Sequence, residues 1–283
     1  MTWLLAIFLG LIQGLTEFLP VSSSGHLAIL QNFFGVAEDL EERHNFFDVL
    51  LHLGTLGAVC VVYRKDLKEM FRAMLFIFSG GRRGGGEEGR IEPSKARLAF
   101  MIIIATFPLI LVLPFRGIIE SLGTRTLFVG VMLLITGGFL YFSDKLVQGR
   151  KEEKKMTVKD ALTVGLLQCV GTIPGISRSG ITITGGLFTG LDRGFSVRFS
   201  FLLSVPAIIG ANIVTLFASL GTVEWALFPR YLVGVLVAGV TGFFAITLVK
   251  RLVDAGSFGK FSYYCWGVGV VAIIGSLILA IAN

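Results

Sequence analysis

Two stretches of this chain decide its fold: Gly10–Gly25, GLIQGLTEFLPVSSSG, and Gly165–Gly180, GLLQCVGTIPGISRSG. At a constant offset of 155 residues, six of the sixteen aligned positions are identical. The identical pairs are Gly10/Gly165, Leu11/Leu166, Gln13/Gln168, Ser22/Ser177, Ser24/Ser179 and Gly25/Gly180. Because glutamine and serine are rare in apolar segments, their recurrence favours an internal repeat over chance similarity of glycine and leucine.

A proline interrupts each copy, at Pro20 and at Pro174. The apolar pieces on either side are shorter than the roughly 20 residues that span a bilayer, or are broken by polar residues. They cover about 3–19, 22–34, 161–174 and 181–191. Each copy is therefore predicted to form a pair of re-entrant helices that enters the membrane and returns.

Six other stretches are long and apolar enough to be transmembrane helices. They cover about 47–63, 98–115, 126–143, 199–219, 228–249 and 261–282. The whole composition agrees, since 54% of the 283 residues are hydrophobic and only 16% are charged. A soluble globular enzyme and a disordered chain are both excluded by these values.

The positive charges predict the orientation. Nine lysines and arginines lie between Arg64 and Arg97, six between Lys145 and Lys159, and three between Lys250 and Lys260. By the positive-inside rule these segments are cytoplasmic, with linkers at about 64–97 and 144–159. The net charge of +6 is therefore explained by topology, and no nucleic-acid partner is expected.

Three full spans separate the two copies, so the second copy lies upside down relative to the first. The fold class expected is an all-α integral membrane protein with an inverted-topology repeat, about six transmembrane helices and two pairs of re-entrant helices. A single polytopic domain covers 1–283, with repeat one at about 1–143 and repeat two at about 160–283. In such folds the site lies near the midplane, where broken helices of the two repeats meet.

Other features carry less weight. The three cysteines lie in apolar stretches, so neither a disulfide framework nor a zinc site is expected. The opening residues are interpreted as mature protein rather than a signal peptide. The insert Gly80–Gly89, GGRRGGGEEG, is typical of a flexible linker.

Gln13 and Glu17 are four residues apart, so they share one face of a helix. A carboxylate at membrane depth is costly and marks a functional hypothesis. With the neighbouring amide, it could hold a divalent cation, orient a water or pair with a cation. The structural alternative is that Glu17 only neutralises Arg178.

The segment from Pro20 to His26 is predicted to be a break followed by a new helix. Ser22, Ser23 and Ser24 exceed what capping needs, and free amides at a helix start attract anions. Ser23, three residues before His26, could be a nucleophile next to a proton carrier.

The segment Pro174–Gly180 is predicted to be an anion cradle. Gly175 lets the backbone approach a ligand, while Ser177, Ser179 and the forked guanidinium of Arg178 supply donors for phosphate. The alternative is an arginine that reaches to the membrane interface. Asp48 could lie near the site or simply at a helix start, and His52 is a weaker candidate.

Together, Gln13–His26 and Pro174–Gly180 closely resemble the motifs of the bacterial undecaprenyl-diphosphate phosphatase family, also known for bacitracin resistance. The resemblance covers essentially the whole chain. It implies hydrolysis of undecaprenyl diphosphate to undecaprenyl phosphate, which recycles the lipid carrier for peptidoglycan. It also implies a divalent cation, Mg²⁺ or Ca²⁺, and a multi-pass protein of the bacterial inner membrane. The site is expected to open to the extracytoplasmic side, and a homodimer is possible.

The resemblance also assigns roles. The catalytic residues expected are Glu17, Ser23, His26 and Arg178. Substrate binding is expected from Gln13, Ser22, Ser24, Gly25, Gly175, Ser177, Ser179 and Thr182. Glu17 is the candidate metal ligand, with Asp48 a weaker one. Because Gln13 replaces the first glutamate of some members, a metal site made by two carboxylates of that helix is in doubt.

The sequence is compared with two alternative functions. Inverted repeats are common in transporters, so a lipid carrier is the first alternative, and it would release no phosphate. A second lipid-phosphatase superfamily shares fragments of these motifs. It is rejected because this chain has no Arg-Pro dipeptide and no histidine after Arg178.

Overall fold

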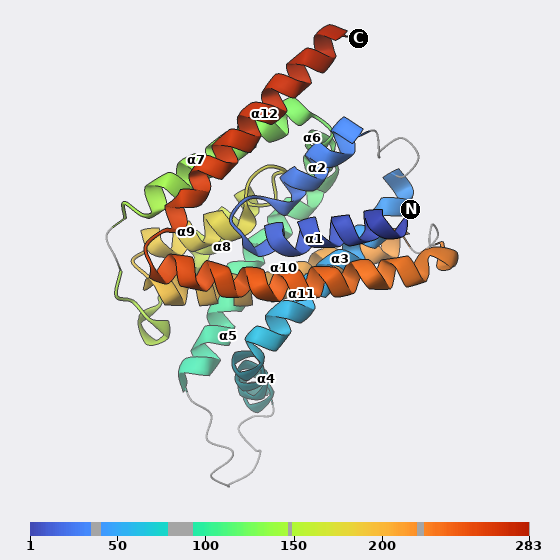
Figure 1. Ribbon diagram of the computed structural model, residues 1–283. Helices are drawn as coiled ribbons and strands as arrows, with labels where there is room; N and C mark the ends of the chain where they lie inside the picture. Colours follow the sequence, from blue (N-terminus) through green and yellow to red (C-terminus); the bar gives the residue numbers. More distant parts are fainter. Residues whose placement is uncertain (35–40, 79–92, 147–148, 220–223, 283) are drawn as a thin grey trace.

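The computed structural model describes residues 1–34, 41–78, 93–146, 149–219 and 224–282. Within these ranges the chain is helical and no residue lies in a β-strand. The insert predicted at Gly80–Gly89 lies outside the described residues. The helices are α1 (Trp3–Phe18), α2 (Ser23–Phe34), α3 (Glu41–Val62), α4 (Arg64–Phe78), α5 (Pro93–Thr106), η2 (Phe107–Phe115), α6 (Arg116–Gly123), α7 (Thr126–Ser143), η3 (Glu153–Lys155), α8 (Val158–Val170), α9 (Arg178–Phe188), α10 (Arg193–Ser219), η5 (Trp225–Leu227), α11 (Phe228–Asp254), η6 (Phe258–Lys260) and α12 (Phe261–Ala282) (Figure 1).

Five stretches of the described chain are long and apolar enough to cross a membrane. They are Pro93–Gly123, Thr126–Ser143, Arg193–Thr215, Trp225–Asp254 and Phe258–Ile281. The bent pair Phe46–Val62 and Arg64–Phe76, which turns by 87°, brings the number to six when its two helices are counted as one span. The prediction of an all-helical, multi-pass membrane protein with about six spans is confirmed.

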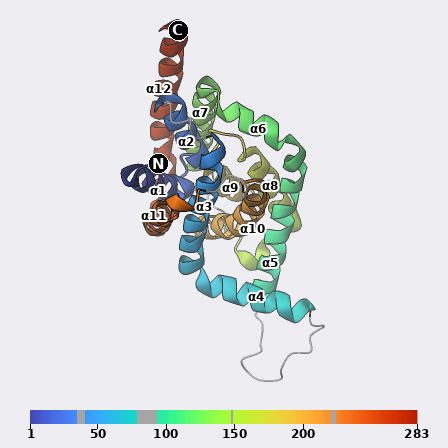
Figure 2. The same cartoon turned by 90° about the vertical axis from the view of Figure 1, so that its right-hand side faces the viewer.

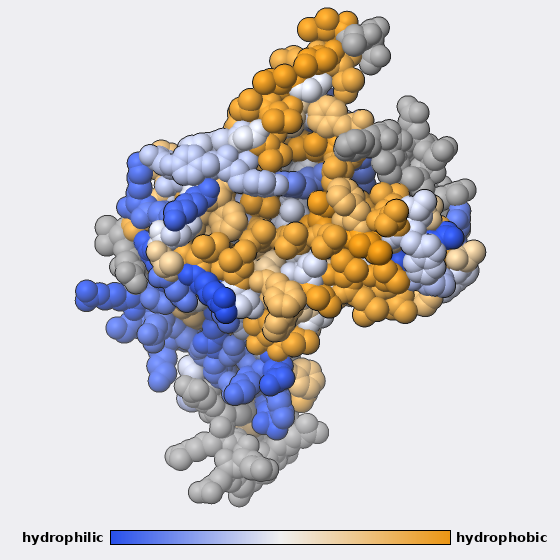
Figure 3. All heavy atoms as spheres, in the orientation of Figure 1, coloured by the Kyte–Doolittle hydropathy of each residue, from blue (hydrophilic) through white to orange (hydrophobic). Residues whose placement is uncertain are grey.

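The surface agrees with a membrane environment. Apolar side chains such as Leu236, Phe244, Val271 and Ile278 are more than half exposed on α11 and α12. Figure 3 shows a broad hydrophobic surface, with hydrophilic residues gathered at one end of the molecule. Because exposed leucine, phenylalanine and isoleucine are compatible with lipid, these faces are lipid-facing.

α4 runs across the lower ends of α3 and α5 (Figure 2). Asp66 of α4 binds Arg198 of α10 and lies 3.0 Å from the Lys95 ammonium of α5. Glu153 joins the same group, 3.2 Å from Arg198 and 3.6 Å from Lys95. This charged network holds four elements together at the basic end of the protein.

α1–α2 and α8–α9 form the two short helix pairs that the repeat predicts. α1 ends before Pro20, and α8 ends at Val170, four residues before Pro174. A residue before proline is disfavoured in helical conformation, and proline donates no backbone hydrogen bond. The two pairs are thus broken at corresponding positions of the repeat.

The two pairs are held by equivalent contacts. A Cβ at Gly10 would lie 2.5 Å from the Gly234 carbonyl oxygen of α11, and one at Gly165 would lie 2.4 Å from that of Ala105 in α5. Only glycine allows backbones this close. Gly10 and Gly165 are therefore equivalent in structure as well as in sequence.

Candidate active site

The turns of the two helix pairs are built alike. The Ser22 hydroxyl accepts a hydrogen bond of 3.1 Å from the Gly25 amide, and the Ser177 hydroxyl accepts one of 3.1 Å from the Gly180 amide. In each turn a second serine follows, with hydroxyl oxygens 3.4 Å apart for Ser22 and Ser24. The corresponding distance is 3.3 Å for Ser177 and Ser179. Each serine pair thus begins a helix, as N-cap chemistry predicts.

The two turns meet. A Cβ at Gly25 would lie 3.0 Å from the Gly175 Cα, so the two glycine backbones are in contact. Both turns also contain a residue with positive φ, Ser22 at 70° and Gly175 at 94°. Serine rarely adopts this conformation, which costs it about 1–2 kcal/mol. The surrounding hydrogen bonds hold Ser22 in place despite this cost.

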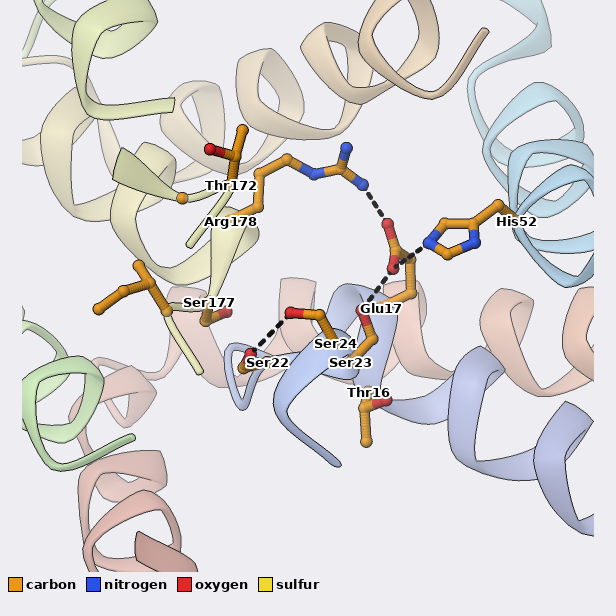
Figure 4. A pocket seen from close by; sticks show the side chains of 11 residues that line it. Thr16, Glu17, Ser22, Ser23, Ser24, His52, Thr172, Ser177 and Arg178 are labelled. Carbon is orange, nitrogen blue, oxygen red and sulfur yellow. Dashed lines mark hydrogen bonds and ion pairs between the residues drawn. The ribbon is translucent and has the colours of Figure 1, made fainter. Parts of the chain in front are cut away.

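A cavity of about 150 Å³ lies between the turns (Figure 4). Its lining contains four pairs of residues related by the offset of 155: Thr16/Gly171, Glu17/Thr172, Ser22/Ser177 and Ser23/Arg178. Ser24, His52 and Ile176 complete it. The cavity therefore lies where the two copies of the repeat face each other.

Glu17 is the centre of the polar contacts in this cavity. Its Oε1 accepts a hydrogen bond from the Arg178 guanidinium, which forms an ion pair. Its Oε2 accepts hydrogen bonds of 2.7 Å from the Ser23 hydroxyl and 3.0 Å from the Gln13 amide. The Glu17 side chain is only 3% exposed, whereas Arg178 is 25% exposed. The arginine therefore presents the more accessible part of the pair.

His52 of α3 contacts the same carboxylate. Its Nε2 lies 3.7 Å from Glu17 Oε2, and its Nδ1 lies 2.8 Å from the Asp48 carbonyl oxygen. Because a carbonyl oxygen only accepts, Nδ1 carries a hydrogen. The nitrogen facing Glu17 can then donate only when the imidazole is protonated.

The family model described as "Bacitracin resistance protein BacA" matches residues 6–271. The chain belongs to this family. Undecaprenyl-diphosphatase of Methanobrevibacter smithii is 40% identical over 274 residues, covering 96% of this chain and 97% of that relative. The same-named protein of Alkaliphilus metalliredigens is 40% identical over 281 residues, covering 98% of this chain and 100% of that relative.

In this BacA-family chain, half of the predicted catalytic and binding residues line the central cavity. The cavity lining includes Glu17, Ser23 and Arg178 of the predicted catalytic set. It also includes Ser22, Ser24 and Ser177 of the predicted binding set. Gln13 reaches the cavity only through Glu17, and its own Oε1 is buried without a hydrogen-bond partner. The prediction that the two motifs form one polar site is consistent with this arrangement.

His26 lies elsewhere. Its Nδ1 is 2.8 Å from the Ser22 carbonyl oxygen, and its Nε2 is 2.8 Å from the Tyr264 hydroxyl of α12. It is absent from the cavity lining. With both nitrogens engaged, His26 fixes the carbonyl of the strained Ser22. Its predicted role in proton transfer stays a prediction.

Other predicted residues support the turns. Gly25 and Gly175 make the backbone contact described above. The Ser179 hydroxyl contacts Ser177, and the Thr182 hydroxyl lies 2.6 Å from that of Ser200 in α10. The Ser179 and Thr182 side chains are buried and do not line the cavity.

The lining also contains residues that were not assigned to the site. His52, a weaker candidate from the sequence, lines the cavity, and so does Thr172. The offset of 155 offered a signal for Thr172, since it is the counterpart of Glu17. Asp48, the weaker metal candidate, lines a neighbouring cavity instead.

The donor set bears on the expected metal. Among the described residues, no group of three histidine, cysteine, aspartate or glutamate side chains could hold a metal ion. Glu17 is the one carboxylate in the lining of the central cavity. Mg²⁺ commonly binds one or two carboxylates together with substrate phosphates and water. The residues therefore fit a cation that arrives with a phosphorylated substrate, but not a cage made by protein alone.

Proposed function

We propose that this chain hydrolyses undecaprenyl diphosphate to undecaprenyl phosphate and inorganic phosphate. The reaction recycles the lipid carrier for peptidoglycan synthesis and confers bacitracin resistance. The observation that carries the proposal is the convergence of Arg178, Glu17 and Ser23 in a polar cavity between the two re-entrant turns. Family membership and relatives named undecaprenyl-diphosphatase support the substrate.

The chemistry of a diphosphate matches this cavity. Its hydrolysis requires neutralised negative charge, an in-line nucleophile and a proton for the leaving group. Arg178 supplies a permanent, forked positive charge. Ser23 attacks the terminal phosphorus or positions a water for the attack. Glu17 accepts the Ser23 hydrogen bond at 2.7 Å and orients Arg178. His26 stays the predicted general acid or base.

We extend the proposal to a divalent cation, Mg²⁺ or Ca²⁺. Glu17 and oxygens of the diphosphate would hold it. Asp48 is the weaker candidate, because it lines the neighbouring cavity and not this one. When bound, the cation supplies additional positive charge for the phosphates. Because the lining of the central cavity contains a single carboxylate, we expect the protein to bind the cation only together with the substrate.

We also propose that the protein resides in the bacterial inner membrane and that its site opens to the extracytoplasmic side. The positive-inside rule places the basic segments in the cytoplasm, and this supports the proposed orientation. The lipid tail lies in the bilayer, against the exposed apolar faces of the helices. A homodimer stays a prediction, which cross-linking in native membranes tests.

The decisive experiment measures phosphate release by the purified protein from C55 and C15 prenyl diphosphates. The wild-type protein should release phosphate, and a chelator should abolish release until Mg²⁺ or Ca²⁺ is restored. Arg178→Ala should lower turnover by about 100-fold or more, because it removes the main fixed charge for the phosphates. Absence of phosphate release by folded wild-type protein would favour the lipid-carrier alternative.

A further inference from the structure

A second cavity, of about 220 Å³, adjoins the central one. It lies between the early turns of α3, the start of α6 and the later turns of α10. Two residues line both cavities, His52 and Arg178. A group that leaves the central cavity past Arg178 therefore enters this second space.

Arg116 is the second arginine of this space. Its Nη2 donates a hydrogen bond of 2.8 Å to the Thr215 hydroxyl, and its Nε donates one of 2.6 Å to Glu120. The Arg116 and Glu120 side chains are 34% and 60% exposed. An ion pair between side chains this exposed stabilises a helix only a little. Arg116 can therefore exchange Glu120 for a more highly charged anion.

The charges facing the second cavity are mixed. Arg116 of α6 and Arg178 of α9 are positive, while Asp48 of α3 and Glu120 of α6 are negative. Two guanidinium groups suit phosphate because each donates from a planar fork. The two carboxylates keep the affinity low, which suits a group that binds in passing rather than a resident ligand.

The proposed reaction creates the need for such a subsite. Water adds across the anhydride: the bond from the terminal phosphorus to the bridging oxygen breaks, and the prenyl phosphate leaves with that oxygen. Two phosphate groups are then present where one diphosphate was bound. The central cavity contains one arginine for both of them.

We propose that the second cavity is a phosphate subsite in which Arg116 receives a phosphate group from Arg178. This inference rests on the proposed function. The ligand is either the released inorganic phosphate or the phosphate of the prenyl product, which present the same chemistry to an arginine.

The test compares Arg116→Gln with Arg125→Gln, a matched control between α6 and α7. Arg125 is exposed and lies outside both cavities. Turnover of farnesyl diphosphate radiolabelled in its prenyl chain is followed by chromatography of the labelled farnesyl phosphate, with unlabelled inorganic phosphate or farnesyl phosphate added as inhibitor. Loss of one charge-assisted contact should raise the half-inhibitory concentration of one product by about tenfold in Arg116→Gln. Arg125→Gln should match the wild type.

A shift for inorganic phosphate identifies the subsite as an exit for the cleaved group, and a shift for farnesyl phosphate identifies it with the prenyl product. Equal values in the two variants for both inhibitors overturn the proposal. Equilibrium binding of radiolabelled phosphate to the wild type and both variants gives a readout without turnover. The same measurement is made with radiolabelled farnesyl phosphate. Inactive wild-type protein would contradict the proposed function, whereas binding of both ligands that Arg116→Gln does not weaken contradicts the subsite.

Discussion

Ser23 and Arg178 occupy equivalent positions in the two copies of the repeat, as do Glu17 and Thr172. The serines that begin the helices are identical in both copies, whereas Ser23 and Arg178, which both contact Glu17, differ from each other. An equivalent backbone thus presents a hydroxyl from one side of the cavity and a guanidinium from the other. At these positions the identical serines shape the turns, and the differing pair carries the proposed chemistry.

Ser23→Ala should lower kcat by about 100-fold or more if Ser23 is the nucleophile or positions the water. Ser24→Ala is the matched control, because Ser24 also lines the cavity but its hydroxyl contacts Ser22 rather than Glu17. Phosphate release in detergent measures both. A large loss in Ser24→Ala alone would move the assignment by one residue.

His52→Ala should lower turnover by about tenfold, since it removes a polar contact to the most buried carboxylate of the site. His52→Gln retains a polar group of similar reach and should recover most of the loss. Steady-state kinetics of both variants give the comparison. Wild-type turnover in His52→Ala would show that the histidine only borders the cavity.

Each of the two helix pairs packs against a neighbouring helix through a close backbone contact at a glycine. Gly165→Ala should destabilise the protein by about 1–3 kcal/mol, because the new methyl group would meet the Ala105 carbonyl oxygen. Gly10→Ala should behave alike at its contact with Gly234. Thermal unfolding in detergent would report both as a lower Tm.

Gly138→Ala on α7 is the control for these two substitutions. A Cβ there meets nothing within 4 Å, so alanine should leave the Tm unchanged or raise it slightly. If Gly165→Ala matched this control, the contact between α8 and α5 would be looser than described.

The helix pairs could be predicted from sequence because proline and short apolar length are local signals. Pairing of Glu17 with Arg178 could be anticipated only through the repeat, since 161 residues separate the two. The contact between His26 and Tyr264 could not be predicted, because it depends on how α12 packs against α2 and no periodicity encodes that register. The contact of His52 with Glu17 could not be predicted either, because the neighbours of His52 in sequence are those of an ordinary transmembrane span.

The whole molecule has an orientation that the positive charges predict. Single cysteines at Thr124 and Lys154, both exposed, should react with an impermeant maleimide from opposite sides of the membrane. The native cysteines are replaced first, and labelling is performed on intact cells and on inverted vesicles. Labelling of both positions from the same side would contradict the odd number of crossings and the inversion of the second helix pair.

The 87° turn between α3 and α4 marks a depth in the membrane. α4 leaves the span at Arg64, with exposed lysines and arginines next to exposed Phe71, a composition suited to the boundary between headgroups and hydrocarbon. Counting back along α3 to His52 at 1.5 Å per residue gives about 18 Å, slightly more than half of a hydrocarbon layer about 30 Å thick. A lipid headgroup that reaches Glu17 and Arg178 must therefore sink roughly 12 Å below its resting level. The bilayer around the entrance must either thin or let water follow it inward.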